Sequence, residues 1–378
     1  MQTAAILWHV SLLVPAERKA LALGLVGLTR VVPIIIFSVL AGVVADALDR
    51  RKLRMLTQSA MALIAVALAV LTFRGLAQVW PIYLLAALSS AAGSFDAPAR
   101  QSLIPNLVPR EHLANAISLN AIMLQTASVV GPSIGGLLIA QLGIGWVYVA
   151  NALSFGGVIT ALGLMRHTPA VRAEPGTVSV RAMTEGLRFV FSAPLIRSTM
   201  LLDFFATLFS SATALLPIFA QDILHVGARG YGWLYAAPPV GALLTSAAMV
   251  RLVDSIKRRG VVLLCAVFAY GMATVVFGMS RTFWITFLAL ALTGAADTVS
   301  TVFRNIVRHM ETPDHLRGRM VGVNMVFFTG GPQLGELEAG LVANWFGAPF
   351  SVISGGLACA LATLIVALRT PALRRYRA

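Results

Sequence analysis

Eight charged side chains stand inside stretches of sequence that are otherwise almost wholly apolar, and these residues could do chemistry. A charge in such surroundings is costly, so it pairs with an opposite charge, exchanges a proton or contacts a ligand. Asp96 and Arg100 are four residues apart, and Asp297 and Arg304 are seven apart, so each pair can share one helix face. We favour ion pairs over proton sites there. The eight residues are Arg30, Asp96, Arg100, Asp203, Asp297, Arg304, Glu336 and Glu338.

The carboxylates are also candidates for proton exchange. Glu336 and Glu338 are two residues apart, so on a helix they point about 200° from each other and cannot both face one ligand. We prefer Glu336 as the titrating group, because it follows Gly335 near the middle of an apolar stretch, and Asp203 is the runner-up. Arg30 lies deep enough to attract an anionic substrate group or to balance a carboxylate.

The sequence contains no recognisable motif of catalytic residues. It has no nucleotide-binding loop, no spacing of zinc ligands and no arrangement of a serine or cysteine nucleophile with its base. Cys265 and Cys359 both fall in apolar stretches, where packing is the expected role. We therefore predict a protein without catalytic residues, cofactor or metal.

The elements that must position these charges are membrane-spanning helices. The chain of 378 residues is 58% apolar and only 12% charged, with a mean hydropathy of +0.83. A run of about 20 apolar residues crosses the hydrocarbon core. Eleven such spans are expected, and a twelfth apolar stretch at the start is only about 14 residues long. The spans are 20–43, 54–73, 79–99, 115–140, 145–165, 198–220, 231–252, 260–279, 283–304, 319–342 and 348–368.

The net charge of +14 has a topological explanation. If the turn at 44–54 is cytoplasmic, 23 of the 29 Lys and Arg residues fall on the cytoplasmic side. The bases are divided among the loops rather than gathered on one polar surface, which argues against nucleic acid as a partner. The positive-inside rule then predicts an inner-membrane protein with a cytoplasmic carboxyl terminus.

The chain repeats itself. The turn "DALDRR" (Asp46 to Arg51) recurs as "DSIKRR" (Asp254 to Arg259), "GPSIGG" (131–136) recurs as "GPQLGE" (331–336), and Asp96 is matched by Asp297. Three matches in order, at offsets of 200 to 208, indicate two parallel halves of six spans. We expect an amino-terminal half at 1–165, a cytoplasmic linker at 166–196 and a carboxyl-terminal half at 197–378.

The repeat also bears on the short first span. At an offset of 208, Met1 aligns with Phe209, in the middle of span 7. A helix that ended at mid-membrane would leave backbone groups unpaired in hydrocarbon. We therefore expect the first half of span 1 to be missing from this sequence.

Two motifs lie at positions where helices meet. In the turn between spans 2 and 3, Asp46 and Arg50 are four residues apart and can pair on one helix face. The bases of that turn could equally serve only to fix topology. In "GPSIGG", small residues allow helices to approach closely and the proline permits a kink. Close helix packing without a functional role is one interpretation of this motif.

These features together resemble the major facilitator superfamily over essentially the whole chain. The family signature at the first turn, a Gly, an Asp four residues later and then two bases, is matched by Gly42, Asp46, Arg50 and Arg51, although Ala47 and Asp49 depart from it. "FDAPARQSLIPNLVP" (95–109), "NALSF" (151–155) and "HLRGRM" (315–320) are similar to the branch of drug and siderophore exporters that contains the enterobactin exporter.

The resemblance implies roles for both motifs. The turn would latch the two halves on the cytoplasmic side, with Asp254, Arg258 and Arg259 as a weaker counterpart. "GPSIGG" is similar to the motif of exporters that exchange substrate for protons, and Gly131, Pro132, Gly135 and Gly136 would form a seam between spans 5 and 8. The branch usually carries an acidic residue early in span 1, at a position that this sequence lacks.

We therefore expect an all-α membrane protein of the major facilitator fold that exports small amphiphilic drugs or siderophores in exchange for protons, as a monomer. An uptake carrier and a non-transporting truncated membrane protein are the alternatives. Cavity-lining candidates are apolar with a few polar points, which suits such cargo. They are Met123, Gln125, Asn151, Phe204, Phe205, Phe209, Trp233 and Tyr235.

Overall fold

The computed structural model describes residues 1–103, 107–165, 187–313 and 316–377. It describes no side chains for a further set of helical positions: 38–40, 42–43, 45–47, 102, 110, 114, 212, 317–319, 321–322 and 325–329. The described chain is helical throughout and holds no strand. It divides into two compact units, residues 1–15 with 28–178 and residues 16–27 with 179–378.

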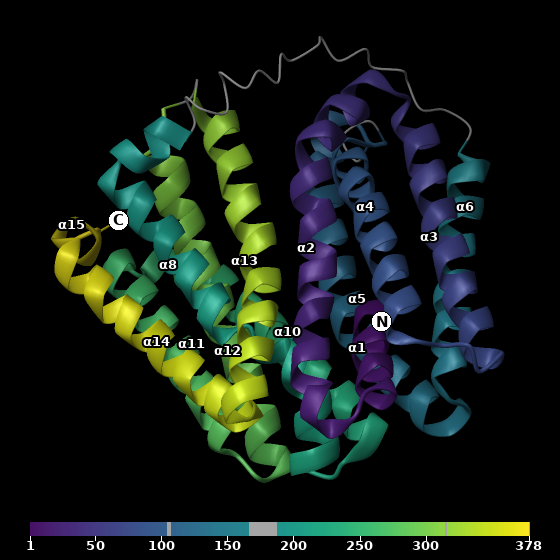
Figure 1. The fold of residues 1–378 in the computed structure, drawn as a ribbon. Helices are drawn as coiled ribbons and strands as arrows, with labels where there is room; N and C mark the ends of the chain where they lie inside the picture. Colours follow the sequence, from purple (N-terminus) through teal and green to yellow (C-terminus); the bar gives the residue numbers. More distant parts are fainter. Residues whose placement is uncertain (104–106, 166–186, 314–315, 378) are drawn as a thin grey trace. The chain divides into compact units, whose positions relative to one another are not determined.

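Unit 1 contains the first six helices, and the sequence sets their ends (Figure 1). Asp49 caps α3, since its carboxylate accepts hydrogen bonds from the backbone N–H groups of Arg51 at 2.9 Å and Lys52 at 3.1 Å. Gly143, with a φ of 89°, makes the single-residue turn from α5 to α6. The helices are α1 Gln2–Leu13, α2 Ala16–Ala47 (shared with unit 2), α3 Arg50–Phe73, α4 Val79–Leu103, α5 Leu113–Leu142 and α6 Ile144–Leu164, with a 3-10 turn, η2, at Arg110–His112.

Unit 2 repeats this plan. Gly347, with a φ of 88°, makes the turn from α13 to α14 in the same way that Gly143 does in unit 1. Its elements are α8 Pro194–Ser210, η3 Ala212–Leu215, α9 Leu216–Ile218, η4 Phe219–Ile223, α10 Gly227–Leu252, η5 Val253–Ser255, α11 Arg259–Met279, α12 Phe283–Met310, α13 Arg317–Phe346, α14 Ala348–Arg369 and α15 Pro371–Arg374.

Helix pairing follows the same repeat. In unit 1, α3 packs against α4 and α6; in unit 2, the corresponding α11 packs against α12 and α14 (Figure 1). The packing of the two glycine motifs also follows the repeat. A Cβ atom on Gly131 or Gly135 of α5 would lie 3.5 Å or 3.4 Å from Met1, the residue before α1. One on Gly335 of α13 would lie 2.6 Å from the Thr207 carbonyl oxygen of α8. Met1 and Thr207 thus lie against corresponding glycines of the two motifs.

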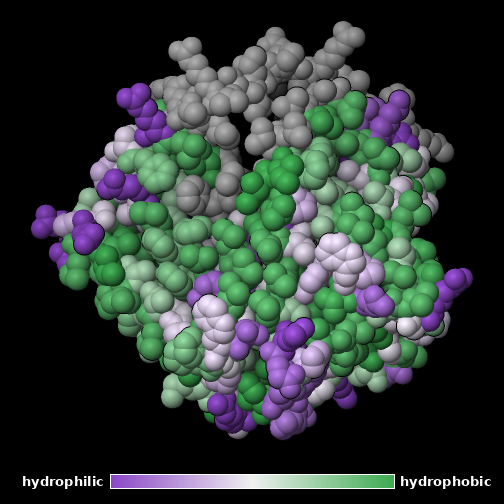
Figure 2. All heavy atoms as spheres, in the orientation of Figure 1, coloured by the Kyte–Doolittle hydropathy of each residue, from purple (hydrophilic) through white to green (hydrophobic). Residues whose placement is uncertain are grey.

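The predicted spans match the helices closely. Within the described residues, nine helices are long and apolar enough to cross a membrane, and α4 and α13, of 25 and 30 residues, occupy two further predicted spans. Hydrophobic side chains cover much of the face shown in Figure 2. Large apolar residues such as Val250 (79% exposed) and Trp80 (73% exposed) point outward, as lipid-facing residues do.

Span 7 differs from the prediction of one continuous helix at 198–220. Its α-helix ends at Ser210, and the chain continues through the 3-10 turn η3, the short α9 and the π-helical turn η4. The broken backbone is covered by glycines of two neighbouring helices. A Cβ atom on Gly335 of α13 would lie 2.5 Å from the Leu208 carbonyl oxygen, and one on Gly355 of α14 would overlap the Phe209 carbonyl group. Interrupted helices in transporters tolerate irregular backbone because it is buried in this way.

Candidate functional site

The charged residues of unit 2 meet between α8 and α12. Arg304 of α12 donates one guanidinium N–H to Oδ1 of Asp203 on α8, and each residue is 2% exposed. The other arm of Arg304 donates to Asp297 Oδ1 at 3.1 Å and to Thr301 Oγ1 at 2.7 Å. The predicted pairing of Asp297 with Arg304 is confirmed, and Asp203 joins it from 101 residues away.

Arg308 completes this charged network. It donates to Asp203 Oδ2 at 3.4 Å and to the Thr199 carbonyl oxygen at 3.3 Å. The sequence predicted a span that ends at Arg304 and left Arg308 in the loop after it, but α12 continues to Met310 and buries both. Two aspartates and two arginines form a neutral set, which a low-dielectric interior tolerates when every charge is paired. We call Asp203, Asp297, Arg304 and Arg308 the α8–α12 network.

Small side chains allow the two helices to hold this network. On α8, Thr199, Asp203, Ala206 and Ser210 are buried at spacings of three or four residues, which places them on one face. On α12, buried small and charged residues also follow one another at spacings of three or four: Thr293, Ala296, Ser300, Arg304 and Arg308. Only one member is open to its surroundings, since the side chain of Asp297 is 48% exposed and the other three are below 5%.

The repeat-related carboxylate of unit 1 has other partners. Asp96 on α4 accepts hydrogen bonds from Gln58 Nε2 at 3.0 Å, Thr57 Oγ1 at 3.3 Å and Arg54 Nε at 3.4 Å, all on α3. The preference for pairing Asp96 with Arg100 was therefore wrong: a neighbouring helix supplies the donors. The positions of α11 that correspond to these three donors by the 208-residue offset hold Val262, Cys265 and Ala266, which explains why Asp297 depends on an arginine of its own helix.

The charged turn between α2 and α3 is resolved in part. Arg51 donates to the carbonyl oxygens of Leu162 at 2.7 Å and Gly163 at 2.8 Å, so it caps the end of α6 within unit 1. Arg50 is partly buried on the first turn of α3. The surroundings of Gly42 and the side chain of Asp46 lie outside what the structure describes, and the latch stays a prediction.

The second copy of this turn has a different backbone. Asp254 lies within the 3-10 turn η5, which ends at Ser255 before α11 begins at Arg259, and both Asp254 and Arg258 are exposed. The role of these residues as a weaker counterpart of the latch stays a prediction. No ion pair joins Asp254 to Arg258 or Arg259 among the described residues, because the helical spacing that would align them is lost at η5.

The antiporter-like motif lies in the middle of α5. Pro132 stands inside the helix, Gly135 and Gly136 are buried, and Gly131 and Gly135 face Met1 as described above. A seam between span 5 and span 8 stays a prediction.

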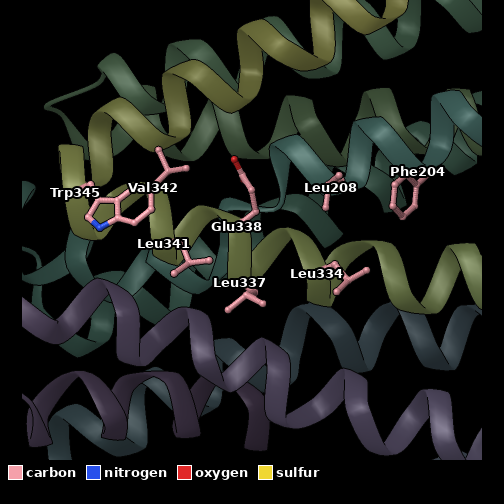
Figure 3. A pocket seen from close by; sticks show the side chains of 8 residues that line it. All are labelled: Phe204, Leu208, Leu334, Leu337, Glu338, Leu341, Val342 and Trp345. Atoms are coloured by element: carbon pink, nitrogen blue, oxygen red, sulfur yellow. The ribbon is translucent and has the colours of Figure 1, made fainter.

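The two glutamates of α13 face different sides, as predicted from their spacing. Glu336 is 7% exposed and packs against Gly27 of α2, where a Cβ atom would lie 2.8 Å from the Glu336 Cβ. Glu338 lines a groove between α8 and α13 (Figure 3). Arg30 lies one turn beyond Gly27 on α2 and is partly buried.

Several polar contacts escaped sequence analysis. His9 of α1 lies 3.1 Å from the Tyr148 hydroxyl of α6, and Asn151 donates to Gln2 Oε1 at 2.6 Å. Polar residues within apolar runs are the signal that could have found them. Asn151 was predicted to line a cavity and instead joins α1 to α6.

The fold and these sites define a class of protein. Two repeat-related helical units, an interrupted seventh span and buried charges within spans are features of a secondary transporter of the major facilitator superfamily. A family model described as a transmembrane secretion effector matches residues 1–376, and the chain belongs to this family.

Curated relatives and solved structures agree with this assignment. The chain is 26% identical to the enterobactin exporter EntS of Escherichia coli O1:K1 / APEC, and 27% identical to that of Shigella boydii serotype 18, over 98% of this chain and 85% of each relative.

Solved structures share the fold. A POT family transporter in complex with a thioalcohol-conjugated peptide superimposes with a TM-score of 0.75 at 10% identity, covering 98% of this chain and 94% of that one. A bacterial homologue of the human lysosomal transporter Spinster, inward-facing and occupied, gives 0.72 at 14% identity, over 99% and 97%. A D-xylose–proton symporter gives 0.74 at 12% identity, over 96% and 93%.

Proposed function

We propose that this protein exports small amphiphilic molecules of the siderophore or drug class across the cytoplasmic membrane, in exchange for protons, by alternating access. Relatives that match nearly the whole chain are named as enterobactin exporters, which supports the direction and the cargo class. The loops rich in Arg and Lys would lie in the cytoplasm together with the carboxyl terminus, and the protein would act as a monomer.

The observation that carries the proton coupling is the α8–α12 network with its one exposed carboxylate. We infer that Asp297 is the group that takes up a proton, because its side chain is 48% exposed, whereas the Asp203 side chain is shielded. Protonation of Asp297 would leave two arginines facing one carboxylate, so the buried contact would carry an excess positive charge. Such a charge is costly in a low-dielectric interior, and the contact between α8 and α12 would loosen.

Loosening this contact couples a proton to cargo in the direction of export. In the state open to the outside, a proton would bind Asp297 as cargo leaves. In the state open to the cytoplasm, release of the proton would restore the network as new cargo binds. The proton can shift the equilibrium between these two states only if it binds them with different affinities. Here the affinities differ because protonation removes the charge of Asp297.

Glu336 is the second candidate for the coupling group. It is buried against Gly27 of α2, where an ionised carboxylate would be desolvated by a helix contact. Its protonation would stabilise that contact, whereas protonation of Asp297 would weaken one. The two residues thus predict opposite effects on neighbouring helix pairs.

The test is transport of a catecholate siderophore by purified protein in proteoliposomes with an imposed proton gradient. We expect uphill transport that a protonophore abolishes. Asp297→Asn should retain exchange of labelled for unlabelled cargo but lose gradient-driven transport. The matched control is Asp96→Asn, the repeat-related position bonded to α3, which should still respond to the gradient.

Two outcomes would contradict the proposal. If Asp297→Asn keeps full gradient-driven transport while Glu336→Gln loses it, coupling belongs to Glu336. If transport by the unaltered protein ignores the protonophore, the protein is a facilitated carrier.

An uptake carrier is the alternative, because a D-xylose–proton symporter shares the fold. It predicts that cells expressing the protein accumulate the siderophore instead of extruding it.

A further inference from the structure

A groove of about 500 Å³ lies between α8 and α13 of unit 2 (Figure 3). Leu208 of α8 and Leu334 and Leu341 of α13 make apolar walls, and Phe204 and Trp345 add aromatic faces at two points along it. Leu334, Glu338, Leu341 and Trp345 follow each other at three or four residues, so they share one face of α13. The groove is of the size that holds a drug-sized molecule.

Among the described residues, Glu338 is the one charged side chain that lines this groove. It is partly buried, and within the described part of the chain it has no hydrogen-bond or ion-pair partner. The two arginines of α12 are engaged elsewhere: Arg304 and Arg308 lie in the α8–α12 network, with Asp203 and Asp297. Glu336 points to Gly27, away from the groove face.

This setting selects the kind of ion that Glu338 can bind. A carboxylate among leucines is poorly solvated, so an approaching positive charge stabilises it. Na⁺ or Mg²⁺ would need several oxygen ligands to replace its water, and the groove lining offers one carboxylate. An organic cation with a delocalised charge sheds water at low cost, fills the apolar walls and can lie against the faces of Phe204 and Trp345.

We propose that the groove between α8 and α13 is a binding site for lipophilic organic cations, with Glu338 as the residue that recognises the charge. The site disfavours anionic amphiphiles, because a negative group beside Glu338 would meet repulsion in apolar surroundings. That such cations are also exported rests on the proposed function. Cationic amphiphiles would then be added to the molecules that the protein carries.

The probe is radiolabelled tetraphenylphosphonium, measured by equilibrium binding to the purified full chain in lipid nanodiscs at neutral pH. We expect saturable binding that Glu338→Gln weakens at least tenfold, while Glu338→Asp keeps part of the affinity. The matched control is Glu311→Gln, an acid-to-amide change at the exposed residue that follows α12, which should bind the cation as the unaltered protein does. Thermal unfolding of each variant establishes that it is folded.

Three results would overturn this assignment. These are no binding of the cation by the unaltered protein, equal binding by Glu338→Gln, and a loss of binding by Glu311→Gln to the same extent as by Glu338→Gln. Equal binding by Glu338→Gln would mean that apolar surface alone attracts the probe, as it would a lipid chain. The proposed function fails separately, when siderophore transport does not respond to the proton gradient whatever the cation binding shows.

Discussion

Lys19, on the first turn of α2, places its ammonium group 2.9 Å from Oδ2 and 3.1 Å from Oδ1 of Asp222 in the π-helical turn η4. It also donates to Gln221 Oε1 at 3.2 Å, and the residue is only 9% exposed. Three acceptors satisfy the three ammonium donors, so this end of α2 is fixed to the end of span 7 within unit 2. The link falls at an irregular stretch of helix, where functional hinges are common.

We predict that this ion pair holds one conformation of the transport cycle. Lys19→Glu should slow transport severalfold through repulsion of Asp222, and the double variant with Asp222→Lys should recover most of the rate. Because Asp222 is 46% exposed, the cost of losing the pair is modest, about 1 kcal/mol. Cargo exchange rates in proteoliposomes measure this, and a double variant no faster than Lys19→Glu would contradict it.

The α8–α12 network predicts a rank order of stability. Asp203→Asn should destabilise the protein more than Asp297→Asn, because Asp203 accepts from both arginines of the network, whereas Asp297 accepts from one of them, Arg304. Removing one partner of a buried pair costs roughly 3–5 kcal/mol. The measurement is the midpoint of thermal unfolding in detergent. Equal midpoints for the two variants would mean that water reaches the arginines.

The two glycine motifs predict unequal tolerance at equivalent positions. Gly335→Ala should strongly impair folding, because its Cβ atom would lie 2.5 and 2.6 Å from two carbonyl oxygens of α8. Gly135→Ala should be mild, because its Cβ atom would lie 3.4 Å from the flexible Met1 side chain. The yield of monodisperse protein measures both, and an equal loss at the two positions would refute the packing argument.

The positive-inside argument predicts the sidedness of the chain. A single cysteine at residue 52 or 375 should react with an impermeant maleimide only in inverted vesicles, and one at residue 74 or 281 only in intact cells. Cys265 and Cys359 would first be replaced by serine or alanine. Labelling of residues 52 and 375 from opposite sides would refute the topology.

Sequence patterns predicted the helices well and their polar contacts poorly, for a physical reason. Hydropathy shows where each apolar run begins and ends, and the thickness of the hydrocarbon core sets the length of helix that crosses it. For this reason α3, α11 and α14 begin and end within a few residues of the predicted spans. Pairing within one helix was also accessible, as Asp297 and Arg304 show, because helical periodicity relates residues of one element.

Contacts between helices distant in sequence were not accessible. Asp96 accepts hydrogen bonds from α3, and Asp203 pairs with Arg304 of α12. These partners could not be predicted, because the rotation of each helix about its axis depends on its packing against other helices and not on its own sequence alone. The break after Ser210 has the same origin. It is accommodated by glycines of α13 and α14, more than 120 residues later in the chain.

The matched turns at Gly143 and Gly347 bear on how the molecule can move. Each joins two long helices through a single residue with positive φ, a backbone geometry that residues with a Cβ atom rarely adopt. Such a joint keeps the adjoining ends of α5 and α6, and of α13 and α14, close together. In the proposed transport cycle we therefore expect each pair of helices to move as one piece, together with the glycine face of α5 or α13, and the longer connections of the chain to change conformation.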